Sequence, residues 1–155
     1  MSTFTDTSEK GFQKYIVKEL VEQNKFRESV SNDFDKEFCN NPKQLWEFIK
    51  ETQPEAYEMI QRKGERSFLV RLDEKIQKLG IIEVLRKGVK HFDKTVELFY
   101  RQPSSNYNLK DLDKYNTNIF SVTQELVYSS DNANRLDLTV FLNGLPIITC
   151  ELKNP

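Results

Sequence analysis

Three charged residues near the end of the chain have the types and the spacing that hydrolysis of a phosphodiester requires. Asp137 lies in one apolar run, and Glu151 and Lys153 lie in the next. Carboxylates can hold a cation that neutralises charge growing on the phosphorus oxygens, and a lysine can orient the attacking water or help deprotonate it. The three residues therefore predict a metal-dependent phosphodiesterase.

The two apolar runs, Arg135 to Leu142 and Pro146 to Lys153, are expected to form neighbouring strands. Side chains alternate along a strand, so Glu151 and Lys153 share one face while Leu152 points into the core. Whether Asp137 lies on that same face depends on the connection between the strands.

Two turns are compatible with Asn143-Gly144. A two-residue turn would set Asp137 opposite Cys150 and leave Glu151 on the other face of the sheet. A three-residue loop closed by a bulge would set Asp137 opposite Thr149 and diagonally beside Glu151, within reach of one ion. The metal-site hypothesis therefore predicts the odd-length turn.

A structural explanation of the same residues competes with the chemical one. A Glu-x-Lys triplet is expected about once by chance in a chain of this composition. Glu151 and Lys153 could form a solvated edge, with Asp137 a charge at a strand end. Against this, all three are embedded in runs apolar enough for core strands, where charges need a partner, a metal or a function.

The composition predicts one domain with a sizeable core, since 155 residues contain 37% hydrophobic residues, 11 Phe and 6 Tyr. Charged residues make up 30% of the chain but leave a net charge of −1. No summed positive field indicates nucleic acid, so any DNA contact must be local or supplied by a partner.

The sequence predicts a cytoplasmic protein with no membrane partner. Cys39 and Cys150 follow no metal or redox spacing, which favours a reducing compartment. Met1 to Thr7 has neither a basic region nor an apolar run of a signal peptide, and no stretch is long and apolar enough for a membrane span.

The first 80 residues are predicted to be helical. A helix from Glu9 to Gln23, capped by Thr7 or Ser8, has an apolar face that we expect to contain Phe12, Tyr15, Ile16 and Leu20. Further helices are predicted to begin at Pro42, at Pro54 and after Gly64, the last ending at Gly80. We interpret residues 33–79 as a helical insert.

Strands dominate the second half. Residues 95–100, 119–128, 135–142 and 146–153 alternate or are β-branched and aromatic, residues 81–85 are ambiguous, and 103–118 is a polar loop. Helices followed by an antiparallel sheet over about 95–153 predict an α+β fold, or a three-layer α/β fold.

A longer string around the three charged residues resembles a known family. The residues from Asn134 to Pro146, followed by Cys150 to Pro155, give an Asp, a hydrophobic strand, Phe-x-Asn-Gly-Leu-Pro and then Glu-Leu-Lys-Asn. This pattern is similar to the N-terminal region of the restriction (HsdR) subunit of type I restriction-modification enzymes. Val96 to Pro103 and Tyr115 to Leu126 extend the resemblance upstream, whereas residues 33–79 match no known segment.

The resemblance implies a PD-(D/E)xK nuclease fold and Mg²⁺-dependent cleavage of double-stranded DNA. By position it implies that Asp137 and Glu151 are metal ligands, that the backbone carbonyl of Leu152 is a third ligand, and that Lys153 positions the attacking water. Glu9 corresponds to a helical glutamate near the family's site, an accessory role. An acid favoured by the helix dipole explains Glu9 equally well.

The resemblance also implies partners. The parent subunit would carry an ATP-driven translocase and would act with methyltransferase and specificity subunits, the latter reading the DNA sequence. The family's Gln-x-x-x-Tyr helix would follow Pro155. We therefore expect residues 1–155 to be a single partial endonuclease domain that is inactive alone and exposes an edge open to self-association. The alternative is a non-catalytic module that docks the R subunit on the methyltransferase core.

Two other features have weaker chemical interpretations. His91, the single histidine, could be a general base, but a surface histidine at a turn is the expected role. The neighbouring cluster of Arg86, Lys87 and Lys90 could contact a phosphate backbone, or form a solvated face.

Overall fold

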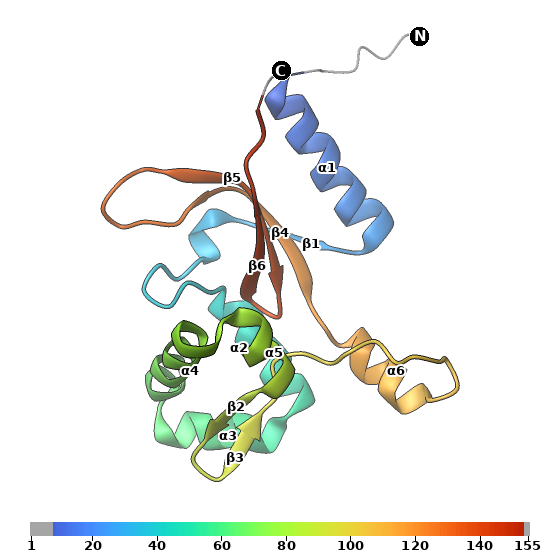
Figure 1. The fold of residues 1–155 in the computed structure, drawn as a ribbon, viewed down its shortest axis with the longest axis vertical. Helices are drawn as coiled ribbons and strands as arrows, with labels where there is room; N and C mark the ends of the chain where they lie inside the picture. Colours follow the sequence, from blue (N-terminus) through green and yellow to red (C-terminus); the bar gives the residue numbers. More distant parts are fainter. Residues whose placement is uncertain (1–7, 154–155) are drawn as a thin grey trace. The chain divides into compact units, whose positions relative to one another are not determined.

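The computed structural model describes residues 8–153, which divide into two units (Figure 1). Unit 1 combines the residues up to Asn41 with those from Phe120 onward, and unit 2 is Pro42–Ile119. Helices and strands are both present and the main sheet is mixed, which confirms the α+β class.

Unit 1 is a four-stranded sheet with one long helix. Its strand order is β1-β4-β5-β6, with β1 parallel to β4 and the other pairs antiparallel. The elements are α1 (Glu9–Asn24), β1 (Arg27–Ser29), the short 3-10 helix η1 (Ser31–Asp33), β4 (Phe120–Val127), β5 (Arg135–Leu142) and β6 (Leu145–Cys150).

Helix α1 begins where the sequence predicts. The Ser8 hydroxyl accepts a hydrogen bond from the Gly11 amide at 3.1 Å and so caps the free N-terminal amides. Thr7, the alternative cap, lies outside the described residues. Lys25 ends the helix in the left-handed conformation, with φ of 59°.

The face of α1 that meets the sheet differs from the predicted one. Gln13 and Val17 are buried, whereas Phe12 and Tyr15 are 53% and 58% exposed, so the prediction for these two aromatic residues was wrong. Ile16 and Leu20, the other two residues of the predicted face, do pack against the small core that α1 forms with the sheet. The buried members of this core are Val17, Val122 and Leu138.

Unit 2 is a helical unit with a small hairpin. Pro54 begins α3 at a position where a missing N–H is harmless, and Gly64 and Gly80 interrupt the helices with positive φ angles. The elements are α2 (Pro42–Thr52), α3 (Pro54–Lys63), α4 (Glu65–Leu79), α5 (Ile81–Lys87), β2 (Val89–His91), β3 (Lys94–Val96) and α6 (Leu109–Asn116). Its fully buried large side chains include Leu45, Phe48, Ile49, Met59, Ile60, Phe68 and Leu72.

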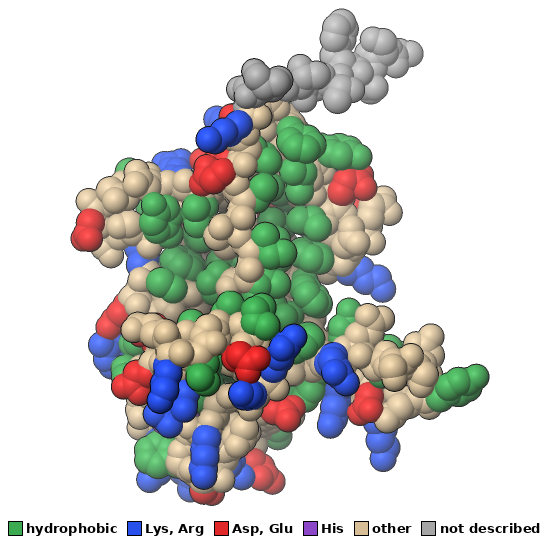
Figure 2. All heavy atoms as spheres, in the orientation of Figure 1, with side chains coloured by type: hydrophobic (Ala, Val, Ile, Leu, Met, Phe, Trp, Pro, Cys, Tyr) green, Lys and Arg blue, Asp and Glu red, His purple; other side chains and the backbone are tan. Residues whose placement is uncertain are grey.

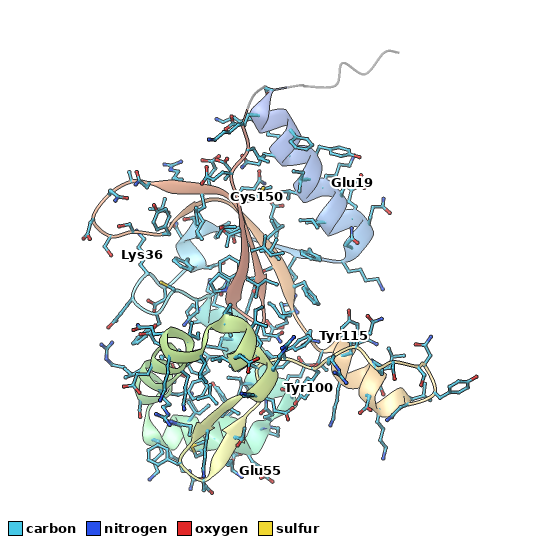
Figure 3. All side chains as sticks on the ribbon, in the orientation of Figure 1. Glu19, Lys36, Glu55, Tyr100, Tyr115 and Cys150 are labelled. Carbon is cyan, nitrogen blue, oxygen red and sulfur yellow. The ribbon has the colours of Figure 1, made fainter. Side chains whose placement is uncertain are left out.

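The sheet expected over residues 95–153 was wrong in two respects. Of the expected segment, only residues from Phe120 onward belong to the main sheet. The sheet also contains β1, a parallel strand in a segment that we interpreted as irregular. The expected strand at 95–100 stops at Val96. Beyond it, side chains bond the backbone: Gln53 accepts from the Glu97 amide at 2.7 Å and donates to its carbonyl at 2.8 Å, and Tyr100 (Figure 3) is bonded by Asn118. Asn118 accepts from the Tyr100 amide at 3.1 Å and donates to its carbonyl at 2.7 Å.

The helical unit is larger than the sequence suggested. The ambiguous residues 81–85 belong to α5, and the expected polar loop 103–118 contains α6, capped by the Asn108 side chain. Whether the helical residues are an insert in a nuclease domain stays a prediction.

The expected surface position of His91 was wrong. The residue is 5% exposed, with Phe68 and Phe92 in edge contact at 5.4 and 4.6 Å between ring centroids. Its Nε2 is buried without a hydrogen-bond partner in the described part of the chain. Burial, and secondarily the charge of Arg71, lower the pKa of His91 below its ordinary value.

The shifted pKa of His91 predicts that the protein loses stability in mild acid. Between the folded pKa and the unfolded value of about 6.5, the unfolded state binds more protons. The contribution of His91 is therefore fully present above the unfolded pKa and is lost as the pH falls through the folded one. Urea unfolding followed by Trp46 fluorescence should show a lower free energy of unfolding at about pH 5.5 than at pH 7.

The control variant is His91→Gln, which cannot titrate in this range. Because His91 is the single histidine, the variant should lose most of the pH dependence above about pH 5.5. Equal slopes for the two proteins would show that burial of His91 does not control the acid response.

Candidate functional site

The turn between β5 and β6 contains two residues, not three. Leu142 pairs with Leu145, and Asn143 and Gly144 both have positive φ, 50° and 82°. This is the conformation that an Asn-Gly pair favours in a two-residue hairpin. The odd-length turn that the metal-site hypothesis predicted is therefore wrong.

A β-bulge further along the hairpin changes the pairing register by one residue, in the direction opposite to that of the predicted three-residue loop. Phe141 pairs with Pro146, but Val140 pairs with Ile148, so Ile147 is one extra residue on β6. The shifted register continues to the pair formed by Leu138 and Cys150. The paired residues end there, at Cys150, and the same register continued by one residue is expected to set Asp137 opposite Glu151.

Packing supports the same assignment of faces. Leu138, Cys150 (labelled in Figure 3) and Leu152 all belong to the core that packs with α1. Because side chains alternate along extended chain, Asp137 and Glu151 project from the opposite face of the sheet. Lys153 continues this alternation and belongs to the same face.

A short hydrogen bond joins the two segments at this point. The Leu152 amide donates to Oδ2 of Asp137 at 2.6 Å, which ties the residues after β6 to β5. The other oxygen of Asp137, Oδ1, accepts no hydrogen bond from the described residues. The side chains of Glu151 and Lys153 are exposed and make no hydrogen bond or ion pair in the part of the chain that the structure describes.

The donor set fits a cation that needs few protein ligands. Within residues 8–153, no three His, Cys, Asp or Glu side chains are grouped so that they could hold a metal ion. Two carboxylates remain, those of Asp137 and Glu151. Mg²⁺ is commonly bound by one or two carboxylates while it keeps several waters, so this pair suits Mg²⁺ better than a metal that requires an all-protein cage.

The structure does not bring Glu9 into this group. Glu9 is the first residue of α1 and is partly exposed. Its carboxylate makes no hydrogen bond or ion pair with any described residue. The helix-dipole explanation accounts for Glu9 as it stands.

Glu125 is a neighbouring acid that the sequence did not indicate. The pairs of Gln124 with Leu138 and of Leu126 with Leu136 set Glu125 level with Asp137 on the adjacent strand. Glu125 has φ of 52°, which interrupts the ladder there, and its carboxylate lies 4.0 Å from the Arg135 guanidinium. No sequence signal reveals this, because residues 119–128 follow a strand pattern throughout.

The sheet face that carries Asp137 is polar even where it is buried. Ser29 and Thr123 share a hydrogen bond at 2.8 Å, and Thr139 is fully buried with its hydroxyl unpaired among the described residues. Phe34 packs against Phe141 at 6.0 Å and covers this face near the turn. Glu151 lies at the other end of β6 and stays exposed.

The comparison with protein families identifies the chain. The family model described as the type I restriction enzyme R protein N terminus (HSDR_N) matches residues 6–155. The chain belongs to this family. The match confirms the resemblance seen in the sequence, and it runs through residues 33–79, for which the sequence offered no counterpart. No solved structure matches the chain.

Within residues 8–153 of this R-protein N terminus, no helix is both long enough and apolar enough to cross a bilayer.

The bond between Asp137 and Leu152 predicts different stabilities for two substitutions. Asp137→Ala should lower the free energy of unfolding by about 1–2 kcal/mol, because the Leu152 amide loses a charged acceptor. Asp137→Asn keeps an acceptor oxygen and should cost about 0.5 kcal/mol or less. Urea unfolding followed by circular dichroism measures both values.

Hydrogen exchange at the Leu152 amide is the local check on this prediction. Protection should be lost in the alanine variant and retained in the asparagine variant. Equal protection in the two would mean that Asp137 does not hold the end of β6.

Proposed function

We propose that this R-protein N terminus is the endonuclease region of a type I restriction enzyme, with a PD-(D/E)xK fold that cleaves double-stranded DNA with Mg²⁺. The observation that supports this most directly is the bulge at Ile147, because the register it leaves at Leu138 and Cys150, continued by one residue, would bring Asp137 and Glu151 to the same face. Membership in a restriction-enzyme family supplies the substrate class. The mixed sheet, with α1 packed on the face away from the acids, is compatible with the proposed fold.

Each residue has a role in this proposal. Asp137 offers Oδ1 and Glu151 its carboxylate as metal ligands, and the Leu152 carbonyl is the third ligand. Lys153, on the same face, orients the attacking water toward phosphorus. A bound Mg²⁺ would neutralise charge on the phosphate oxygens. The Leu152 amide holds Oδ2 of Asp137 in place and leaves Oδ1 for the metal.

The wider context of the reaction is part of the proposal. We place the cleavage in the cytoplasm, in a complex with methyltransferase and specificity subunits. ATP would act on a translocase of the parent subunit and not on residues of this chain. Recognition of a DNA sequence would belong to the specificity subunit.

A docking module is the second candidate, and one structural feature favours it. β6 is an edge strand whose Ile148 is 56% exposed, and Phe12 and Tyr15 of α1 are exposed as well. Exposed apolar side chains near an open strand edge indicate a surface for another segment or subunit. Docking and cleavage are compatible, so the test must separate them.

Lys153→Ala in the assembled restriction complex tests the catalytic role. Lys153 is exposed and unpaired among the described residues, so folding should be unaffected, while DNA cleavage should fall by about 100-fold or more. Lys110→Ala removes the same charge from an exposed position on α6 and should leave cleavage unchanged. Retained cleavage by assembled Lys153→Ala would refute the role.

Asp137→Asn separates the two candidate functions. The substitution keeps the bond to Leu152 but weakens the metal site, so the variant should assemble with its partner subunits at wild-type yield and fail to cleave. Co-purification of the subunits and a plasmid cleavage assay measure the two properties. Assembly with full cleavage would leave only the docking function.

A further inference from the structure

Unit 2, which does not contain Asp137 or Glu151, has a pocket of about 460 Å³ between α4 and the β2–β3 hairpin. It is an open surface hollow rather than an enclosed cavity. Helix α4 and the hairpin contribute its lining through Ser67, Val70, Arg71, Lys90, His91 and Phe92.

The polar part of the lining is suited to an anion. Nε of Arg71 donates to the carbonyl of Lys90 at 3.5 Å, a long bond that draws the guanidinium toward the hairpin. Ser67 adds a hydroxyl. The one acid that lines the pocket, Glu74, lies 3.6 Å from Arg71 in an exposed pair that binds weakly. Guanidinium and ammonium groups supply the donors that phosphate oxygens accept.

Phe92 stands at the rim in a conformation that its residue type does not favour. It occupies the hairpin turn with φ of 53°, where Gly or Asn would be less strained, and the residue is 54% exposed. The ring of His91 contacts it at 4.6 Å, and the Lys63 ammonium lies 5.0 Å from its centroid. A strained, exposed aromatic residue beside several cations indicates a surface for a ligand with apolar and anionic parts.

The two units differ in net charge, and the unit that contains the pocket is the positive one. Unit 2 has 15 Lys and Arg against 12 Asp and Glu, whereas unit 1 has 8 against 12. Figure 2 shows Lys and Arg side chains over the part of unit 2 that contains α4, α5 and the hairpin, interspersed with Asp and Glu. The net charge of −1 therefore conceals a positive unit that can attract a polyanion.

We propose that this pocket holds the sugar-phosphate backbone of DNA, with a phosphate between Arg71 and Lys90 and a deoxyribose against Phe92. The identity of the nucleic acid rests on the proposed function. The pocket would be a second DNA contact, separate from the proposed cleavage residues. A phosphorylated protein would meet the same cations, but membership in a restriction-enzyme family favours DNA.

The test is fluorescence anisotropy of the 155-residue chain with a labelled duplex of about 20 base pairs, in EDTA, over a range of salt concentrations. Arg71→Ala and Lys90→Ala should each weaken binding by about fivefold and lower the salt dependence by about one ion. Glu74→Gln should strengthen binding. Arg101→Ala, which removes an equal charge from a different pocket of unit 2, should change it by less than about twofold.

Phe92→Asn tests the apolar contact separately. Asn tolerates positive φ, so the hairpin should fold, and thermal unfolding checks this. Binding should weaken by about threefold with an unchanged salt dependence, because no charge is removed.

Several results would overturn the proposal. One is that Arg71→Ala and Arg101→Ala weaken duplex binding equally. Another is that the chain does not bind the duplex at all. A third is that a phosphorylated peptide displaces the duplex more readily than unlabelled DNA does. If Arg71→Ala and Lys90→Ala weaken duplex binding as expected while cleavage by the restriction complex does not depend on Lys153, the pocket stands and the proposed function fails.

Discussion

The register between β5 and β6 is the constraint on which the candidate site depends. In a regular ladder beginning at the Asn143-Gly144 turn, Asp137 would face Cys150 and the two acids would lie on opposite faces of the sheet. One extra residue, Ile147, moves the pairing by one position. The hydrogen bond from the Leu152 amide to Asp137 then holds the shifted register beyond the last paired residue of β6.

The hydrophobic core enforces the same arrangement from the other side of the sheet. Val17 of α1 packs with Val122 and Leu138, and Cys150 and Leu152 pack against this group. If β6 slipped by one residue along β5, Cys150 and Leu152 would lose their apolar contacts and Glu151 would be buried. Both changes would lower the free energy of unfolding. The arrangement of the candidate site thus depends on buried residues on the opposite face of the sheet.

The sequence predicts features that depend on local chemistry. Ser8 caps α1, Pro42 and Pro54 begin helices, and Gly80 ends one, because each effect involves a few neighbouring residues. The family string from Asn134 onward was also sufficient to assign the chain to restriction-enzyme R proteins, as the family match confirms.

The features that escaped prediction depend on distant residues. The bulge at Ile147 has no signal in the sequence of β6, and the pairing of β1 with β4 joins segments about 90 residues apart, with no signal in either one. His91 is buried by aromatic rings, one of them from α4, and Phe12 is exposed because the sheet selects another face of its helix. The positive charge of unit 2 was concealed by averaging over the whole chain.

The most direct measurement is a titration of the isotopically labelled chain with Mn²⁺, followed by paramagnetic broadening of its backbone amide signals. One shared site predicts that the signals of Asp137, Leu138, Glu151 and Leu152 broaden together at substoichiometric Mn²⁺, and that Asp137→Asn reduces the effect at all four. Broadening confined to one strand, or unchanged by the substitution, would contradict the account.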